Sequence, residues 1–382
     1  MTDNYADIRP FNDEEVTTVL QRLLTSDELL GALLNYRFPS LPGIVKPIAK
    51  PVFSARVRKE FSQVDSIEAF QLWLEPKIER LLQRSTTEVV VEGLDQLNPA
   101  TPYAWISNHR DIAMDPTMIN YSLHLAGWPT SRIAIGDNLL NNPDVADIMR
   151  LNKSFIVKRS IDNKRQKLRE LQRLSGYIRH SIEEGQSIWI AQREGRAKDN
   201  IDKTDTAVLK MLALHGRERK ESFAETMQAL NPVPVSIEYE WDPCDLMKAK
   251  ELVSRASADD YQKDDEEDVR SILTGLTGAK GKVKVNFGTP LVAEQLQDAD
   301  IMANHIDQQL QSMIEVLPVH HAALWLLQQK SDRFSQHRVD LTLNLSKDIE
   351  ALNQRIAGQS SAVQQRLLEN YAAPLILEAT KT

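Results

Sequence analysis

The chain has 382 residues, 42% of them hydrophobic and 26% charged, which suits one large domain or two of ordinary size with a substantial core. Its formal net charge of −8 argues against a general nucleic-acid binder, and its single cysteine, Cys244, excludes an internal disulfide. The N-terminus lacks the basic start and apolar stretch of a signal peptide, and nowhere do about 20 apolar residues run together. We therefore expect a cytoplasmic protein without a transmembrane helix. Neither histidine nor arginine flanks Cys244, which predicts an inert thiol.

The first 85 residues are expected to be helical. Residues 13–36 and 64–84 have the periodicity of helices, the second with apolar residues at three- and four-residue steps. The stretch 37–59 between them contains no acid and six basic residues, namely Arg37, Lys46, Lys50, Arg56, Arg58 and Lys59. It is also apolar and has four prolines. Two interpretations stay open: a peripheral contact with the inner face of the cell membrane, and an irregular strap packed on the domain.

From Glu88 onward, short apolar runs alternate with helical patterns, which predicts an α/β sheet layered by helices. The expected strands are Val89–Gly93, Tyr103–Ser107, Ser187–Ala191, Val233–Tyr239 and Lys282–Gly288. The expected helices are 116–126, 141–150, 163–184 and 206–215. The acidic run Asp259–Asp268 is predicted to be a solvated helix start or loop. After Pro290 the sequence returns to helices, including 304–317 and 319–330, and ends in a polar tail.

The sequence SNHRDIAMDPTM, Ser107 to Met118, follows an apolar strand and could form a catalytic base, a metal site or a helix cap. We expect Asp115 to cap a helix whose first residue is Pro116. His109 then lies in a loop at the carboxyl end of a strand, where α/β proteins place their sites. A histidine held there by a carboxylate can take a proton from a hydroxyl group.

Cationic residues follow two other apolar strands. In QREGRAKDN, Arg193, Arg196 and Lys198 flank Glu194-Gly195, and in NKSFIVKRS an apolar run leads into Lys158-Arg159. Glycine lets the backbone approach a ligand, and clustered cationic groups suit a phosphate. A base candidate and two phosphate-sized cationic clusters, all at strand ends, together indicate a site.

Four blocks in this order resemble the glycerophospholipid acyltransferase superfamily, which includes glycerol-3-phosphate and 1-acylglycerol-3-phosphate acyltransferases. The blocks are Asn108-His109 with Asp115-Pro116, then Phe155 to Arg159, then Glu194-Gly195-Arg196, and finally the proline-containing strand Val233 to Ile237. The resemblance covers roughly 88–292. It implies a mixed sheet flanked by helices in that domain, with a helical N-terminal segment (1–87) and a helical C-terminal extension (293–382).

The resemblance also implies residue roles. His109 would be the general base and Asp115 its orienting carboxylate. Lys158, Arg159, Arg193 and Arg196 would contact the acceptor's phosphate, with Glu194 and Gly195 shaping the third loop. The chain departs from the family pattern in two places: the gap between His109 and Asp115 is one residue longer, and Arg196 follows Gly195 one residue early. Pairing of His109 with Asp115 then requires the extra residue to bulge into the loop, and Asp111 is the competing partner.

The implied reaction transfers a fatty acyl group from acyl-CoA or acyl-carrier protein to the hydroxyl of a glycerol phosphate or lysophospholipid acceptor. Thioester attack needs no metal or other cofactor, and no metal-ligand spacing occurs in the sequence. The alternative is a non-catalytic lipid-binding or scaffold protein that has kept the fold. A kinase interpretation of His-Arg-Asp fails because no glycine-rich phosphate loop or Asp-Phe-Gly accompanies it.

Overall fold

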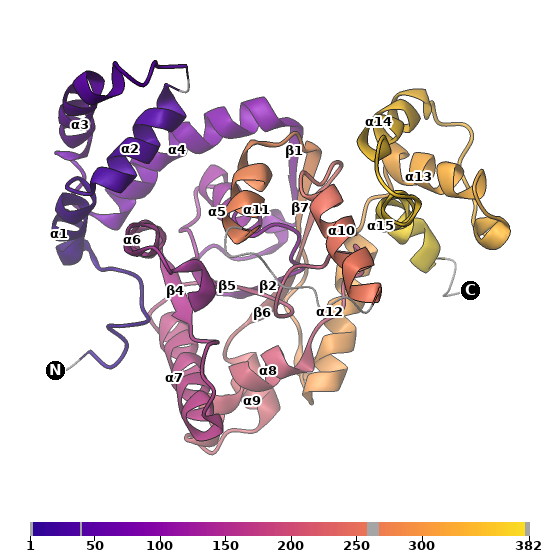
Figure 1. The fold of residues 1–382 in the computed structure, drawn as a ribbon. Helices are drawn as coiled ribbons and strands as arrows, with labels where there is room; N and C mark the ends of the chain where they lie inside the picture. The colour runs from indigo at the N-terminus through magenta and orange to yellow at the C-terminus, as the bar shows by residue number, and fades with distance from the viewer. Residues whose placement is uncertain (1–2, 39, 258–266, 379–382) are drawn as a thin grey trace. The chain divides into compact units, whose positions relative to one another are not determined.

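The computed structural model describes residues 3–38, 40–257 and 267–378, which divide into two compact units. Unit 1 comprises 1–80 and 131–178, and unit 2 comprises 81–130 and 179–382, in each case as far as described (Figure 1). The boundaries of these units differ from those of the three segments expected from the sequence (1–87, 88–292 and 293–382). The division into those three segments stays a prediction. No helix within the described ranges combines the length and the apolar character needed to cross a bilayer.

Unit 1 is mainly helical. It contains α1 (Asp13–Leu23), α2 (Asp27–Arg37), α3 (Lys46–Phe61), β3 (Arg132–Gly136), α6 (Pro143–Leu151) and β4 (Ser154–Val157), with β3 and β4 parallel. It also contains most of α4 (Ile67–Ser85) and of α7 (Lys164–Glu183), whose last five residues belong to unit 2. The single helix predicted over 13–36 is two helices because Ser26 begins a new one, its Oγ accepting from the Leu29 N–H. The core of unit 1 joins α1, α4 and α6 through Val16, Leu20, Phe70 and Leu151.

The irregular strap expected within 37–59 is wrong for residues 46–61, which form α3. Pro47 lies in the first turn, where a helix leaves its N–H groups without partners in any case, so its missing N–H costs nothing there. Pro51 is accommodated inside the helix. The proline count therefore misled the sequence-based prediction.

Unit 2 contains a mixed sheet of five strands in the order β1-β7-β6-β2-β5. The strands are β1 (Thr86–Glu92), β2 (Ala104–Ser107), β5 (Ile188–Ala191), β6 (Pro232–Tyr239) and β7 (Gly281–Phe287). Only β6 and β7 pair antiparallel. In this register Ser107 lies beside both Ala191 and Val235, so the segments that follow β2 and β5 leave the sheet at one edge, next to the second half of β6.

Helices flank this sheet. They are α5 (Met114–Leu125), α8 (Thr206–Leu212), α9 (Phe223–Gln228), α10 (Asp245–Ala256), α11 (Glu267–Thr277) and α12 (Ala299–Met313), followed by the C-terminal helices. Glu238 on β6 accepts from the Glu315 N–H just beyond α12, whereas Tyr239 donates to Asp115 on α5. Successive strand residues point to opposite faces, so α5 and α12 cover opposite faces of the sheet. The predicted α/β class, with a mixed sheet flanked by helices, is confirmed.

The C-terminal part of unit 2 is folded into helices, so the predicted helical C-terminal extension is confirmed and the polar tail expected at its end is wrong. Here α13 (Pro318–Gln328), α14 (Ser346–Ile356) and α15 (Ser361–Glu378) pack together and against α10 (Figure 1). Their shared core includes Leu324, Leu352, Leu367, Leu368 and Tyr371. The apolar residues are spaced so that each helix buries one face. The polar residues between them make the overall composition of this segment polar, which is why the sequence suggested a tail. Residues 259–266 of the acidic run lie outside the described residues, and its last two residues begin α11.

Candidate active site

The site begins where β2 ends. Asn108, fully buried, exchanges two hydrogen bonds with Ile237 of β6: Nδ2 donates to the Ile237 C=O at 3.1 Å, and the Ile237 N–H donates to Oδ1 at 2.8 Å. The side chain thus continues the β2–β6 pairing for one more step. On the other flank, the Ala197 N–H donates to the His109 C=O at 2.8 Å. The backbone at His109 is therefore held by β6, through its neighbour Asn108, and by the loop that follows β5.

His109 pairs with Asp115. The His109 Nδ1 lies 2.8 Å from Asp115 Oδ2, the carboxylate is fully buried, and the imidazole side chain is 14% exposed. The ring contacts Trp189 of β5 edge to face. A carboxylate on Nδ1 fixes the tautomer that leaves Nε2 free of its proton, which is the form that acts as a base.

The loop accommodates the extra residue between His109 and Asp115. Asp115 Oδ2 also accepts from the backbone N–H groups of Arg110, at 2.6 Å, and Asp111, at 2.9 Å. The loop closes around one carboxylate oxygen, so the spacing of five intervening residues brings His109 onto the carboxylate. The pairing of His109 with Asp115 rather than Asp111 is confirmed.

The predicted capping geometry is wrong. Helix α5 begins at Met114, so Asp115 and Pro116 lie inside its first turn. The N-cap is Ala113, and Asp111, two residues before it, accepts through Oδ1 from the N–H groups of Ala113 and Met114 at 3.0 and 2.8 Å. Burial, reinforced by the charge of Asp115, raises the pKa of Asp111. The two carboxylates thus have separate roles: Asp111 starts the helix and Asp115 holds the histidine.

Tyr239 completes the surroundings of Asp115 and was missed by the sequence analysis. Its hydroxyl donates to Asp115 Oδ1 at 2.8 Å. Burial, and then the charge of Asp115, raises the pKa of Tyr239 well above its usual value, so it stays a donor. It lies two residues beyond the block Val233–Ile237, and that strand position was the available signal.

Arg110 is the second residue that the sequence did not single out. Its guanidinium is buried and donates to Asp202 Oδ2 at 2.6 Å and to Asn200 Oδ1 at 3.1 Å, while its C=O accepts from Lys248 Nζ at 2.7 Å. Burial raises the pKa of Asp202 despite the opposing effect of the Arg110 guanidinium. Arg110 is therefore an internal support of the loop and does not present its charge to a ligand.

The third block lies on the loop after β5. Gly195 has a φ of +76°, a backbone conformation that glycine adopts easily and that most residues with a side chain avoid. Arg193 and Arg196 are half-buried, and Arg196 donates to Ser271 Oγ on α11 at 3.3 Å. Glu194 is exposed on the same turn. Lys198, in contrast, forms an ion pair with buried Glu251.

Lys158 and Arg159 belong to unit 1. Lys158 pairs with Asp7 and Glu170, and the Arg159 N–H donates to Asp137 at 3.2 Å. The pKa of the Lys158 ammonium is raised, because these carboxylates outweigh the effect of burial. The predicted phosphate contact through these two residues stays a prediction.

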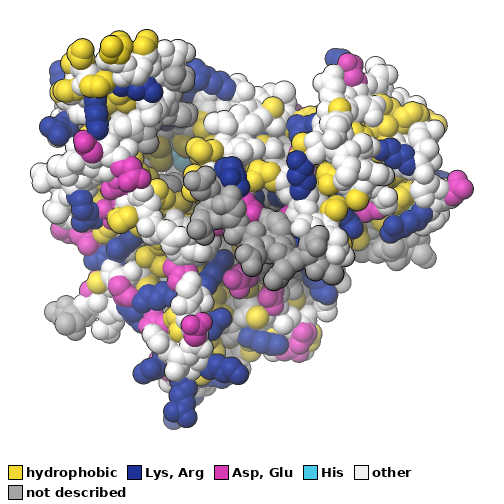
Figure 2. Space-filling model, viewed as in Figure 1, with side chains coloured by type: hydrophobic (Ala, Val, Ile, Leu, Met, Phe, Trp, Pro, Cys, Tyr) yellow, Lys and Arg dark blue, Asp and Glu magenta, His cyan; other side chains and the backbone are white. Residues whose placement is uncertain are grey.

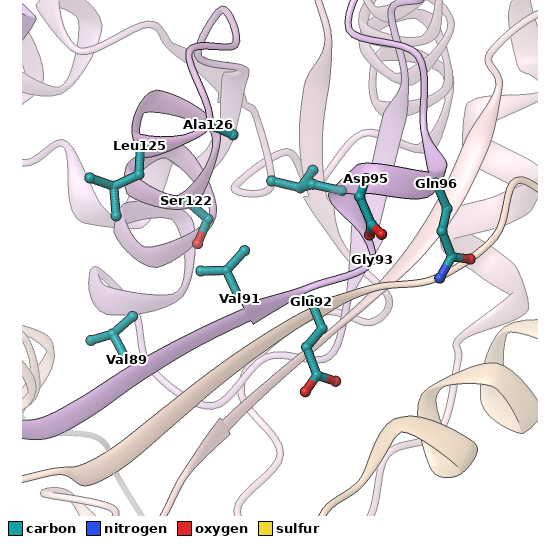
Figure 3. A pocket seen from close by; sticks show the side chains of 10 residues that line it. Val89, Val91, Glu92, Gly93, Asp95, Gln96, Ser122, Leu125 and Ala126 are labelled. Atoms are coloured by element: carbon teal, nitrogen blue, oxygen red, sulfur yellow. The ribbon is translucent and has the colours of Figure 1, made fainter.

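A cavity of about 750 Å³ lies elsewhere in unit 2 (Figure 3). Val89 and Val91 of β1 face Ser122, Leu125 and Ala126 at the end of α5. None of the residues predicted for the site lines it. The chemistry of the His109 loop and this cavity are therefore separate features of the same unit.

Residues 88–238 match the family model described as Acyltransferase, and all four sequence blocks lie inside the match. These residues are an acyltransferase domain. The predicted superfamily and the predicted class of enzyme, an acyltransferase, are thereby confirmed for this domain.

The buried thiol of Cys244, which also lies in unit 2, has its pKa raised to about 12, mainly by burial, as expected for an inert cysteine.

No curated protein sequence matches the chain. Among solved structures, the chain is similar to the 1-acyl-sn-glycerophosphate (LPA) acyltransferase PlsC from Thermotoga maritima, with 17% identity and a TM-score of 0.40, over 77% of this chain and 95% of that one.

Proposed function

We propose that this protein transfers a fatty acyl group from an acyl thioester, acyl-CoA or acyl-carrier protein, to the hydroxyl of 1-acylglycerol-3-phosphate or glycerol-3-phosphate in phospholipid synthesis. The observation that carries the proposal is the 2.8 Å contact between His109 Nδ1 and Asp115 Oδ2 inside the acyltransferase match. This pair gives the domain a base held at a strand end, where an acceptor hydroxyl can reach it.

In the proposed reaction, His109 Nε2 takes the proton of the acceptor hydroxyl as its oxygen bonds to the thioester carbonyl carbon. The carbon–sulfur bond then breaks, and the leaving thiolate receives the proton from the imidazolium, giving an ester and a thiol. Asp115 stabilises the imidazolium between these steps. Arg193 and Arg196 hold the acceptor's phosphate on the loop shaped by Glu194 and Gly195.

The purified protein should be assayed with both kinds of donor against glycerol-3-phosphate and its 1-acyl derivative. We expect His109→Ala to lower kcat by about 10²–10⁴-fold, the usual contribution of a general base. His305→Ala, on α12, makes a matched control because His305 takes no part in the hydrogen bonds of the site, and it should keep full activity. Unchanged turnover in His109→Ala would refute the mechanism. Absence of turnover with every donor–acceptor pair would favour the non-catalytic, lipid-binding interpretation.

We further propose that α3 rests on an anionic membrane surface. Ile44, Ile48 and Val52 recur at four-residue steps and are 86%, 74% and 73% exposed, whereas Ser54 and Val57 on the other side of the helix are buried. Figure 2 shows hydrophobic side chains gathered with Lys and Arg over α3. The stretch 37–59 contains no acid, so an apolar face is bordered by net positive charge.

Some of this charge is already engaged within unit 1. Lys50 pairs with Asp27, and Arg56 lies 3.5 Å from Glu60. The apolar contact should therefore contribute most of the affinity, with the cations selecting anionic lipid. Ile48→Ser combined with Val52→Ser should abolish sedimentation with phosphatidylglycerol vesicles, while Leu341→Ser, at an equally exposed apolar residue outside α3, should not. Equal binding to phosphatidylcholine vesicles would argue against the role of the cations.

A further inference from the structure

The C-terminal helix α15 is connected to the His109 loop through two consecutive residues. Asn370 and Tyr371 are both buried, and each begins a separate chain of hydrogen bonds within unit 2. Both chains end at Arg110, the residue next to His109. Helix α15 lies beyond the matched acyltransferase residues, so nothing in the four sequence blocks accounts for these contacts.

The first chain runs through the loop after β5. Asn370 Nδ2 donates to the Lys198 C=O at 2.8 Å, and Asn200 Nδ2 donates to the Asn370 C=O at 2.9 Å. Asn200 Oδ1 then accepts from the Arg110 guanidinium at 3.1 Å. The backbone of Asn200 has a φ of +58°, in the left-handed region that asparagine adopts more readily than most residues with a side chain. Two hydrogen bonds from α15 hold this loop: the Asn370 side chain donates to the Lys198 C=O, and the Asn370 backbone C=O accepts from Asn200.

The second chain runs through α10. The Tyr371 hydroxyl accepts from the Asp242 N–H at 3.1 Å and donates to Asp245 Oδ2 at 2.8 Å. The Asp242 carboxylate pairs with buried Lys248, whose Nζ donates to the Arg110 C=O. Arg110 is thus held at its side chain by one route and at its backbone by the other. Its own N–H donates to the carboxylate oxygen that pairs with His109.

We propose that Asn370 and Tyr371 are positioning residues that fix the loop 192–202 and Arg110 from the C-terminal helix. The consequence for catalysis rests on the proposed function: Arg193 and Arg196 lie on the clamped loop, so loosening it raises the KM for the phosphate-bearing acceptor. The KM for the thioester donor is expected to stay unchanged. A purely structural role would instead lower the active fraction, with both KM values unchanged.

The test uses full-length protein with Asn370→Ala and with Asn370→Asp, which keeps the side-chain size but faces the Lys198 carbonyl with an oxygen. Asn353→Ala is the control, because Asn353 is an exposed asparagine on α14. Hydrogen–deuterium exchange reports on the loop without any need for turnover. We expect peptides covering 192–204 to exchange about tenfold faster in both Asn370 variants, with β2 peptides and the control unchanged.

The kinetic arm measures both KM values where the wild type turns over. An acceptor KM about tenfold higher in Asn370→Ala, with the donor KM unchanged, supports the proposal. Wild-type exchange rates in the loop of both Asn370 variants overturn it, whatever the activity. A wild type that acylates no acceptor refutes the proposed function alone, because faster exchange in the variants still supports the clamp. Tyr371→Phe tests the second chain, with faster exchange expected around 108–113.

Discussion

Replacing Asp115 with Asn tests the His109–Asp115 pair with little disturbance of the fold. Oδ2 accepts from His109 and from two backbone N–H groups, and Oδ1 accepts from Tyr239. An asparagine amide can put its oxygen toward the first three donors and its NH₂ group toward the Tyr239 hydroxyl, which can also accept. The hydrogen bonds survive and only the negative charge is lost.

The expected cost follows from the geometry of the pair. With Nδ1 and Oδ2 2.8 Å apart, the centres of charge of an imidazolium and the carboxylate lie about 4 Å apart. At an effective dielectric constant of about 20, two such charges attract by about 4 kcal/mol. The attraction exists while His109 carries the proton and is absent from the neutral amide. We therefore expect kcat to fall by about 10³-fold, since each 1.36 kcal/mol is a factor of ten.

The assay compares kcat of Asp115→Asn with that of the wild type, after thermal unfolding has shown that both are folded. Asp111→Asn is the matched control, because the asparagine oxygen can still accept from the Ala113 and Met114 N–H groups, and its activity should stay within a few-fold of the wild type. Activity of Asp115→Asn within tenfold of the wild type would refute the electrostatic reasoning. If only Asp111→Asn lost activity, the carboxylate that orients His109 would be Asp111 and not Asp115.

Three further predictions concern the surroundings of the pair and the stability of unit 2. Tyr239→Phe leaves a buried carboxylate oxygen without its donor, so urea unfolding should show a loss of about 1.5–3 kcal/mol, accompanied by lower kcat; unchanged values would contradict the role of the hydroxyl. Burial lowers the pKa of His320 to about 4, so the unfolded state, with an ordinary pKa of 6.5, binds more protons between these values. The free energy of unfolding should then fall by about 3 kcal/mol as the pH drops from 6.5 to 4, and His320→Gln should flatten this dependence in urea titrations. Gly275→Ala would place a Cβ 1.9 Å from buried Asp111 Oδ2, so it should destabilise the protein by about 1–3 kcal/mol; wild-type stability would show that α11 can shift.

The amino-acid pattern predicted most elements of the fold. Strands β2, β5, β6 and β7 and helices α4, α7 and α12 all fall where apolar periodicity indicated them, because each buries one face or both. The prediction failed for α3, where the prolines favoured an irregular segment. A helical C-terminal extension was predicted, but its polar composition hid the separate helices α14 and α15. Strand β3 and helices α9, α10 and α11 were not predicted.

The sequence by itself determined the chemical groups of the site and their place at strand ends. His109, Asp115 and the cationic third block are recognisable because their residue types and order follow buried strands. It could not decide between Asp111 and Asp115, since a loop can turn either carboxylate toward the ring. Only the tertiary structure decided this, through backbone N–H groups that converge on one Asp115 oxygen. The same holds for Tyr239, Asn200 and Asn370, whose partners are distant in sequence. Hydrogen bonds of this kind depend on the folded path of the chain and leave no local pattern to read.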